Sequence, residues 1–447
     1  MAVDLIPLVD EGLGNNSYLV DLGDGRALAV DVSRDLRAVR AATRRRGLRV
    51  AFAAETHLHS DFLSGAVQLA ATDGARVLAS AAGERDFAHS SLRDGDEADL
   101  GGLRLRAMAT PGHTHEHLSY LLLDGDVPVG VFTGGSLLVG AAARSDLVAP
   151  EETQSLARAQ YASLRRLTRL ADDVEVWPTH GAGSFCTAPA GLDRTSTIGR
   201  EKATNPLLAV ADEAAFVEAV TSGPGSYPPY FLWLPEQNRL GPPLLDAPPA
   251  SAGLSASQTQ RLLDDGAWVL DVRPVASFAA GHISGSVSIP LRPVFASWLG
   301  WLIPPGTRLI IVREPAQDVG EILWQAAKIG YDTIIGELAG GVGAWQAAGG
   351  RLAALPLADP AASSGRLVLD VRQRAEYAAG HVPGAVNVEL GEFATVAADL
   401  PAREMLVMCG HGERAMSAAS LLARAGHRDV TVLAGGPQDL AHSLVTA

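Results

Sequence analysis

An internal duplication constrains the fold of this chain more than any other feature. The segment VLDVRPVASFAAGHISGSVSIPL at residues 269–291 returns as VLDVRQRAEYAAGHVPGAVNVEL at residues 368–390, with 13 of 23 aligned positions identical. The offset between the two segments is 99 residues, and ELAGGVGAW at 337–345 likewise matches VLAGGPQDL at 432–440. This spacing is that of a domain, so we expect two related domains in the second half of the chain.

Each copy has the pattern of alternating strands and helices. A strand ending in Asp-Val-Arg is followed by a short helix, a Gly-His turn, further apolar strands and a second helix, which predicts an α/β domain with a parallel sheet. A Pro- and Gly-rich stretch separates this pair from the first half of the chain. The expected organisation is an N-terminal domain at 1–240, a linker at 241–256, and repeated domains at 257–355 and 362–447.

Composition excludes several classes of protein. No apolar run approaches the roughly 18 residues of a membrane span, and the N-terminus lacks a basic segment followed by an apolar block, so we expect a cytoplasmic protein without a membrane partner. The net charge of -14 disfavours nucleic acid as a ligand. The two cysteines, Cys186 and Cys409, exclude a disulfide framework.

Histidines gather at expected strand ends in the N-terminal domain. The stretch THLHSDF places His57, His59 and Asp61 after an apolar run, and TPGH and PTHG add His113 and His180. Hydrogen bonding alone does not need this spacing, whereas imidazole and carboxylate ligands converging on one cation do. The sequence therefore predicts a metal site.

These motifs resemble the metallo-β-lactamase superfamily across most of residues 1–240, which implies an αβ/βα sandwich. ETHLHSDFLSG, PTHGAGSFC and TSTIGREKATNP are similar to its persulfide dioxygenase branch, particularly members fused to rhodanese domains. That resemblance implies one non-haem iron, held by two histidines and one aspartate, and oxidation of a thiol persulfide to sulfite. The implied ligands are His57 and His113, but Gly135 occupies the position of the aspartate.

The missing carboxylate should impair the implied iron site. Altering a partner outside the ligand shell costs roughly 10- to 100-fold in affinity or activity, so losing an anionic ligand should cost more. We expect weak or absent Fe(II), with zinc as an adventitious occupant. Four residues stay open as substitute ligands or supporting groups: His59, Asp61, His115 and His180. Phe62 replaces a histidine that hydrolytic relatives use for a second metal, which makes a two-metal hydrolase the weaker interpretation.

A second chemical signal is the segment MLVMCGHGERAMSAASLLARAG at 405–426. An apolar strand leads into Cys409, and a helix follows a short glycine-containing loop, which suits stabilisation of a thiolate or persulfide anion by backbone N–H groups. The segment resembles rhodanese sulfurtransferases, which implies Cys409 as the sulfur acceptor, with Arg414 supplying positive charge. The expected persulfide-binding loop comprises Gly410, His411, Gly412, Glu413 and Ala415. We interpret Asp370, Arg372 and His381 as mainly structural.

The first copy lacks this chemistry. Aligning the LAGG motifs places Glu314 opposite Cys409 and Val319 opposite Arg414, which predicts an inert copy that serves as a spacer or docking surface. Cys186 is interpreted as structural, or at most as a redox-sensitive bystander, because no base or helix start accompanies it.

The leading hypothesis is an enzyme of sulfane-sulfur metabolism that transfers sulfur through a Cys409 persulfide. A working persulfide dioxygenase with a substitute iron ligand and a non-catalytic persulfide-binding scaffold are the two alternatives. The expected partners are a low-molecular-weight thiol persulfide or thiosulfate, and a homodimer stays open.

Overall fold

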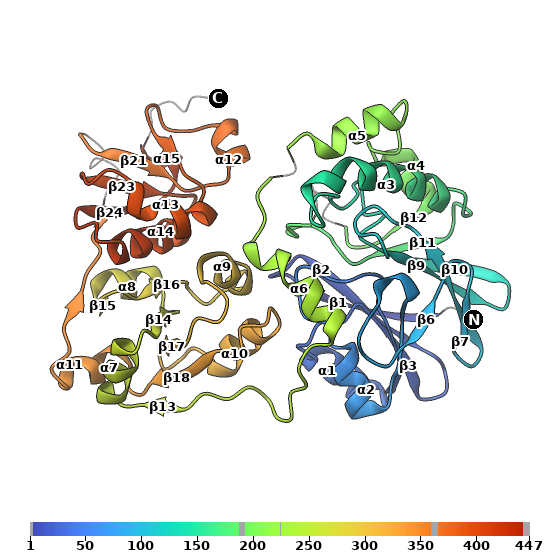
Figure 1. The fold of residues 1–447 in the computed structure, drawn as a ribbon, viewed down its shortest axis with the longest axis horizontal. Helices are drawn as coiled ribbons and strands as arrows, with labels where there is room; N and C mark the ends of the chain where they lie inside the picture. Colours follow the sequence, from blue (N-terminus) through green and yellow to red (C-terminus); the bar gives the residue numbers. More distant parts are fainter. Residues whose placement is uncertain (1–2, 187–192, 224, 359–364, 441–447) are drawn as a thin grey trace. The chain divides into compact units, whose positions relative to one another are not determined.

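The computed structural model describes residues 3–186, 193–223, 225–358 and 365–440 (Figure 1). The chain divides into two compact units, Met1–Pro248 with Ala327–Gly330, and Pro249–Ala326 with Tyr331–Ala447. Within the described residues, no helix combines the length and the apolar character that crossing a bilayer requires.

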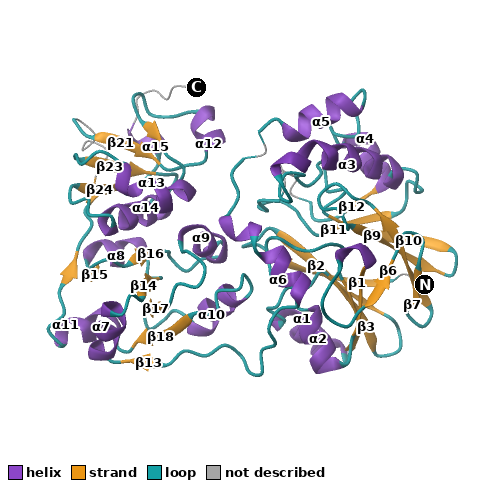
Figure 2. Ribbon diagram, viewed as in Figure 1, coloured by secondary structure: helices purple, strands orange, loops and turns teal. Residues whose placement is uncertain are grey.

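Two six-stranded sheets form the body of the first unit (Figure 2). The first sheet has the order β1 (Asp4–Asp10), β2 (Asn15–Asp21), β3 (Arg26–Val30), β4 (Arg49–Ala54), β5 (Arg76–Ser80) and β6 (Ser90–Leu92). The second has the order β12 (Ser196–Thr197), β11 (Glu175–Pro178), β10 (Val127–Gly134), β9 (Leu118–Asp124), β8 (Leu103–Ala109) and β7 (Glu97–Asp99). Side chains from both sheets share one core, which includes Tyr18, Leu28, Tyr120, Phe132 and Trp177.

Helices cover the outer faces of this sandwich. Val39 of α1 (Arg37–Arg46) and Leu69 of α2 (Ala66–Asp73) pack in one cluster with residues of the first sheet. The second sheet is covered by α3 (Thr153–Leu167), α4 (Ile198–Thr204) and α5 (Glu213–Thr221), whose apolar residues cluster with those of β9, β10 and β11. The short α6 (Leu234–Leu240) follows. The predicted αβ/βα sandwich is confirmed.

The second unit contains two five-stranded sheets with the same topology. The first has the order β13 (Gly253–Leu254), β18 (Ile334–Leu338), β17 (Leu309–Val312), β14 (Trp268–Asp271) and β16 (Val287–Ser288). The second has the order β20 (Leu357–Ala358), β24 (Val430–Leu433), β23 (Met405–Met408), β21 (Leu367–Asp370) and β22 (Val386–Asn387). Every strand pair in both sheets is parallel, which confirms the prediction from the duplicated pattern.

Helices accompany each of these sheets. The first copy has α7 (Ala256–Asp264), α8 (Val275–Ala280), α9 (Phe295–Leu302), α10 (Val319–Ala327) and α11 (Gly341–Ala347), with a small antiparallel pair of β15 (His282–Ile283) and β19 (Leu352–Ala353). The second copy has α12 (Arg374–Ala379), the turn η5 (Leu390–Glu392), α13 (Phe393–Val396), α14 (Glu413–Arg424) and α15 (Pro437–Leu440).

Strand register corrects one detail of the sequence comparison between the copies. Asp271 pairs with Val312 in the first copy, and its counterpart Asp370 pairs with Met408 in the second. The residue that follows the strand is therefore Arg313 in one copy and Cys409 in the other, so Glu314 is one position too far along. The conclusion that the first copy lacks the thiol is unchanged.

Candidate functional site

The histidine cluster of the first unit lies where strands of both sheets end. His57 and His59 follow β4, His180 follows β11, and His113 lies in the loop between β8 and β9. All four side chains are buried. Strands from two packed sheets thus bring together residues more than 120 positions apart in sequence, since His57 and His180 contact each other across a separation of 123.

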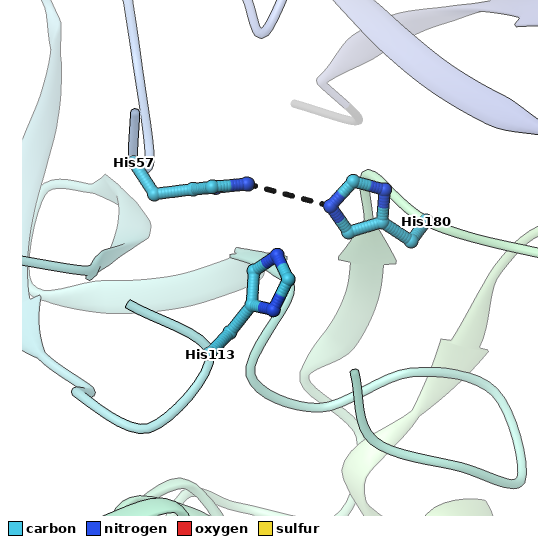
Figure 3. A group of neighbouring side chains, drawn as sticks. All are labelled: His57, His113 and His180. Atoms are coloured by element: carbon cyan, nitrogen blue, oxygen red, sulfur yellow. Dashed lines mark hydrogen bonds between the residues drawn. The ribbon is translucent and has the colours of Figure 1, made fainter. Parts of the chain in front are cut away.

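Three of these histidines converge on one point (Figure 3). The candidate ligand atoms of His57, His113 and His180 all lie within 4.8 Å of one another, and the Nε2 atoms of His57 and His180 are 3.4 Å apart. The opposite ring nitrogens are fixed by oxygen atoms: Thr56 Oγ1 at 2.8 Å for His57, the Arg144 carbonyl at 2.7 Å for His113 and Asn15 Oδ1 at 3.0 Å for His180. Such bonds set the tautomer and ring orientation of histidine ligands. The Nε2 atom of His113 has no hydrogen-bond partner among the described residues.

Electrostatics keep this group neutral. Burial lowers the pKa of His113 and of His180 to about 3, with neighbouring histidines adding to the effect. Burial also lowers the pKa of His57 well below its ordinary value. Neutral imidazole is the form that binds metal, so at neutral pH the three rings offer lone pairs rather than protons.

Gly135 provides no ligand, and its missing side chain has a structural use. A Cβ atom built there would lie 2.4 Å from Cδ2 of His113, so the ring of His113 occupies the space next to the glycine. The backbone N–H of Gly135 instead donates to His117 Nε2 at 3.0 Å. The two-histidine, one-carboxylate set expected for ferrous iron therefore does not fit at this position, whereas three histidines are a known zinc set.

Two further groups of potential ligands share residues with the first. Asp31, His57 and His59 form one, and Asp61, His180 and Cys186 form the other. Burial acts to raise the pKa of Asp31, but the adjacent His59 at 3.3 Å outweighs it and holds that pKa at about 2. Burial also raises the pKa of Asp61 and raises that of the Cys186 thiol well above its ordinary value. These clusters of His, Asp and Cys could hold a metal.

Of the four possible substitute ligands, three lie in the buried ligand groups and one lies outside them. His59, Asp61 and His180 are buried within the ligand groups. His115 is half exposed and pairs with Glu152, so it lies outside those groups. Sequence reasoning missed Asp31, whose only signal was its place directly after an apolar strand, and His117, the last of three alternating histidines in HTHEH.

The Cys409 loop of the second unit is built as a turn between β23 and α14. The side chain of Cys409 is only 1% exposed, but its sulfur does not face apolar groups alone, because Sγ accepts the N–H of Gly412 at 3.1 Å. Among the described residues this is the one hydrogen bond to Sγ, where several were expected. Gly412 has a φ of 102°, a conformation that L residues rarely adopt. Gly410 lies in the same turn, Glu413 and Ala415 lie in the first turn of α14, and His411 is exposed.

Arg414 is already paired. Its Nη1 and Nη2 atoms donate to the two carboxylate oxygens of Glu376 at 2.6 and 2.9 Å. Burial acts to lower the pKa of Arg414, but Glu376 outweighs it and raises that pKa. The guanidinium that was expected to balance the sulfur charge therefore has a carboxylate partner, which limits the positive charge it contributes to the loop.

Comparison with known proteins matches a family model to each of the two units. The model of the metallo-beta-lactamase superfamily matches residues 10–180, and that of the rhodanese-like domain matches residues 255–348 and 354–442. A metallo-beta-lactamase structure from Staphylococcus aureus subsp. aureus COL is 28% identical with a TM-score of 0.66, covering 76% of this chain and 99% of that one.

Curated relatives match the first unit only in part. A hydroxyacylglutathione hydrolase from Pseudomonas putida (strain GB-1) is 30% identical over 35% of this chain and 67% of its own length. A hydroxyacylglutathione hydrolase from Acidiphilium cryptum is 38% identical over 26% of this chain, and the human mitochondrial persulfide dioxygenase is 29% identical over 37% of it. The chain spans only 48% and 60% of those two relatives. The chain belongs to the metallo-beta-lactamase superfamily, with two rhodanese-like domains joined to that fold.

Proposed function

We propose that the protein acts in sulfane-sulfur metabolism as a rhodanese-type sulfurtransferase, with Cys409 as the residue that carries the sulfur. The observation that carries this proposal is the position of Cys409 Sγ, which receives the Gly412 N–H at the start of α14. A backbone donor and a helix N-terminus both stabilise negative charge on sulfur. The rhodanese-like match over residues 354–442 supports the same reaction class.

The transfer proceeds in two displacements. The Cys409 thiolate attacks the outer sulfur of a donor such as thiosulfate, an Sγ–S bond forms, the S–S bond of the donor breaks, and sulfite leaves with the electron pair. A nucleophile such as cyanide or a thiolate then attacks the terminal sulfur of the persulfide, and Cys409 recovers the electron pair as a thiolate. Atoms and electrons balance without an added oxidant.

Mass spectrometry of the intact chain after exposure to thiosulfate tests this proposal. We expect one added sulfur, mapped to Cys409, and its removal by cyanide. Cys186 serves as an internal control, because it should stay unmodified, and Cys409→Ser should abolish both the added sulfur and thiocyanate formation. A thiol at Cys409 that stays bare under these conditions would instead favour the non-catalytic scaffold.

For the first unit, the convergence of three histidines supports a second candidate function. We propose that His57, His113 and His180 hold one divalent cation, with zinc favoured over ferrous iron, so that persulfide dioxygenase activity is weak or absent. Zinc in a three-histidine site, when bound, lowers the pKa of a coordinated water. The chain itself fixes the three rings through their Nδ1 atoms and keeps them neutral by burial.

Metal analysis of protein produced with both iron and zinc supplied tests this candidate. We expect close to one equivalent of zinc, lost in His180→Ala and kept in His115→Ala, which changes a histidine outside the group. Oxygen uptake with a thiol persulfide should stay near background. One equivalent of iron together with rapid oxygen uptake would overturn the candidate and favour the alternative in which another side chain replaces the carboxylate.

A further inference from the structure

The short helix α6 holds the loop that follows His57. Asn238 of α6 is only 1% exposed, and its Nδ2 atom donates to the carbonyls of His59 at 2.7 Å and Phe62 at 2.9 Å. Its Oδ1 atom accepts the backbone N–H of Ser64 at 2.8 Å. Both N–H groups of this amide and its oxygen therefore bind the backbone between β4 and α2.

The next residue of α6, Arg239, holds a second loop. Its Nη1 atom donates to the Glu84 carbonyl at 3.1 Å, and its own carbonyl accepts the N–H of Asp86 at 2.9 Å. Glu84 has a φ of 46°, one of two positive φ values at non-glycine residues in the described part of the chain. Such a backbone conformation persists where the surroundings fix it. Because Arg85 lies between the two bonds, α6 fixes it from both sides.

Arg85 connects this second loop to His57. The Arg85 side chain is buried, its Nη2 atom donates to the His57 carbonyl at 3.3 Å, and its Nε atom lies 3.3 Å from Glu55 Oε2. A Cβ at Gly83 would lie 2.4 Å from Arg85 Nη1, so the guanidinium occupies space that glycine leaves open. Helix α6 therefore holds the metal loop at two points, after His57 directly and at His57 through Arg85.

The loop that Asn238 binds also orients His180. Asp61 lies between the two carbonyls that Asn238 contacts, and it accepts Asn15 Nδ2 at 2.6 Å. Asn15 Oδ1 in turn lies 3.0 Å from His180 Nδ1. Bonds of this kind behind a metal-binding histidine fix its tautomer and ring orientation, and they leave the lone pair on Nε2.

We propose that α6 completes the metal centre of the first unit, with Asn238 as the main positioning residue and Arg239 as a second one. Asp61, held in place by these contacts, supports His180 through Asn15. Helix α6 follows the region that matches the superfamily model, so chain beyond that region supplies part of the centre. The inference rests on the proposed binding of one cation and names what holds two of its three histidines.

Zinc affinity of the full chain, measured by competition with a chelator, tests this inference. Asn238→Ala leaves two carbonyls and one N–H without their partner, and such changes behind a ligand cost roughly 10- to 100-fold, so the dissociation constant for zinc should rise by about that factor. Asn238→Asp has nearly the same shape and keeps the oxygen for Ser64 but loses both donors, so it should bind zinc as weakly. Arg239→Gln should cause a smaller rise, because the backbone bond to Asp86 stays.

Two controls separate positioning from a general loss of stability. Phe216→Leu trims a fully buried side chain of α5, among the helices that cover the second sheet, and should lower the unfolding temperature without changing zinc affinity. Leu240→Ala changes an exposed residue of α6 and should behave as the wild type. In protein loaded with cobalt(II), whose visible absorption reports ligand geometry, the spectrum should change in the Asn238 variants and stay the same in both controls.

Nitrogen-15 spectra of the histidine rings in the metal-free chain separate this inference from the proposed function. We expect the ring signals of His57 and His180 to shift in Asn238→Ala, and those of His113, which the Arg144 carbonyl holds, to stay. Zinc binding as tight as in the wild type, with an unchanged cobalt spectrum, would overturn the role of α6 while leaving the cation site intact. A wild type that takes up no zinc, but whose His57 and His180 signals depend on Asn238, would support the role of α6 and reject the cation site. An equal loss of zinc in Phe216→Leu would reduce Asn238 to a contributor to stability and overturn the inference.

Discussion

The two rhodanese-like copies share a buried frame, which consists of an Asp–Arg pair, a glycine carbonyl that the arginine contacts and a histidine stacked on an aromatic ring. They differ in the loop after the central strand. In the first copy Arg273 Nη2 donates to Asp271 at 2.7 Å and to the Gly281 carbonyl at 2.8 Å. In the second copy Arg372 Nη2 donates to Asp370 at 2.6 Å and to the Gly380 carbonyl at 2.8 Å. A histidine also stacks on an aromatic ring in each copy, His282 on Phe278 and His381 on Tyr377. The same buried contacts therefore occur in the copy with Cys409 and in the copy without it.

The loop after the central strand is where the copies diverge. In the first copy residues 313–318 lie between β17 and α10, and their own side chains fill the turn, because Arg313 pairs with Glu337 at 2.6 Å and Gln317 donates to the Val272 carbonyl at 2.7 Å. In the second copy only residues 409–412 lie between β23 and α14. The two copies thus share the buried frame although the loop after the central strand differs in length and in residue types, so the frame does not depend on the loop that holds Cys409.

Breaking the shared frame should have the largest effect on stability. Asp271→Ala and Asp370→Ala each leave a buried arginine without its carboxylate, which costs about 3–5 kcal/mol in the free energy of unfolding. Because the two pairs have the same geometry, we expect similar losses in urea unfolding of the full chain. An exposed pair serves as the control: Asp24→Ala, which removes the partner of Arg26 on the surface of the first unit, should change stability little. A loss in one copy only would show that the frames are not equivalent.

Loop geometry provides a smaller and more selective test. Gly412 and Gly426 flank α14, and both have a φ of 102° with space for a Cβ. Replacing either by alanine should cost about 1–2 kcal/mol through backbone strain alone. Only Gly412→Ala should also slow thiocyanate formation, because alanine disfavours a φ of 102° and a shift of the backbone there would move the N–H that Cys409 Sγ accepts. Equal activities in the two variants would mean that the turn has no chemical role.

The duplicated frame was predictable from the sequence because its signals are local. Strand, Asp-Val-Arg, helix and Gly-His turn recur with the same spacing, and burial enforces them in both copies. The exact equivalence of Arg313 and Cys409 was not predictable, because the loops differ in length and only strand pairing fixes the register.

The histidine site shows the same limit in another form. The sequence identified His57, His113 and the missing carboxylate at Gly135. It named His180 as one of four possible substitute ligands but could not single it out from His59, Asp61 and His115, nor show that the His113 ring occupies the space beside Gly135, since both depend on how two sheets pack.

The smallest predicted effect concerns a position that the two copies use differently. Glu376 binds Arg414 in the second copy, whereas its counterpart in the first, Ser277, donates to Glu314 at 2.5 Å. Burial acts to raise the pKa of Glu376, but the hydrogen bonds and charge of Arg414 outweigh it and lower that pKa below its ordinary value. A carboxyl whose pKa is lower in the folded state stabilises the fold above its unfolded pKa, and this contribution is lost as pH falls through the folded value.

Glu376→Gln should therefore be less stable than the wild type at neutral pH, and the difference should shrink as pH falls from about 6 to about 3. The Glu376 side chain is 40% exposed, so solvent screening limits the effect to about 1 kcal/mol or less. Urea unfolding at a series of pH values measures it, and Ser277→Ala gives the matched change in the first copy, where no such dependence on Arg414 exists. A difference that grows on acidification would contradict the assignment, because it would require the carboxyl to be protonated more readily in the folded state than in the unfolded chain.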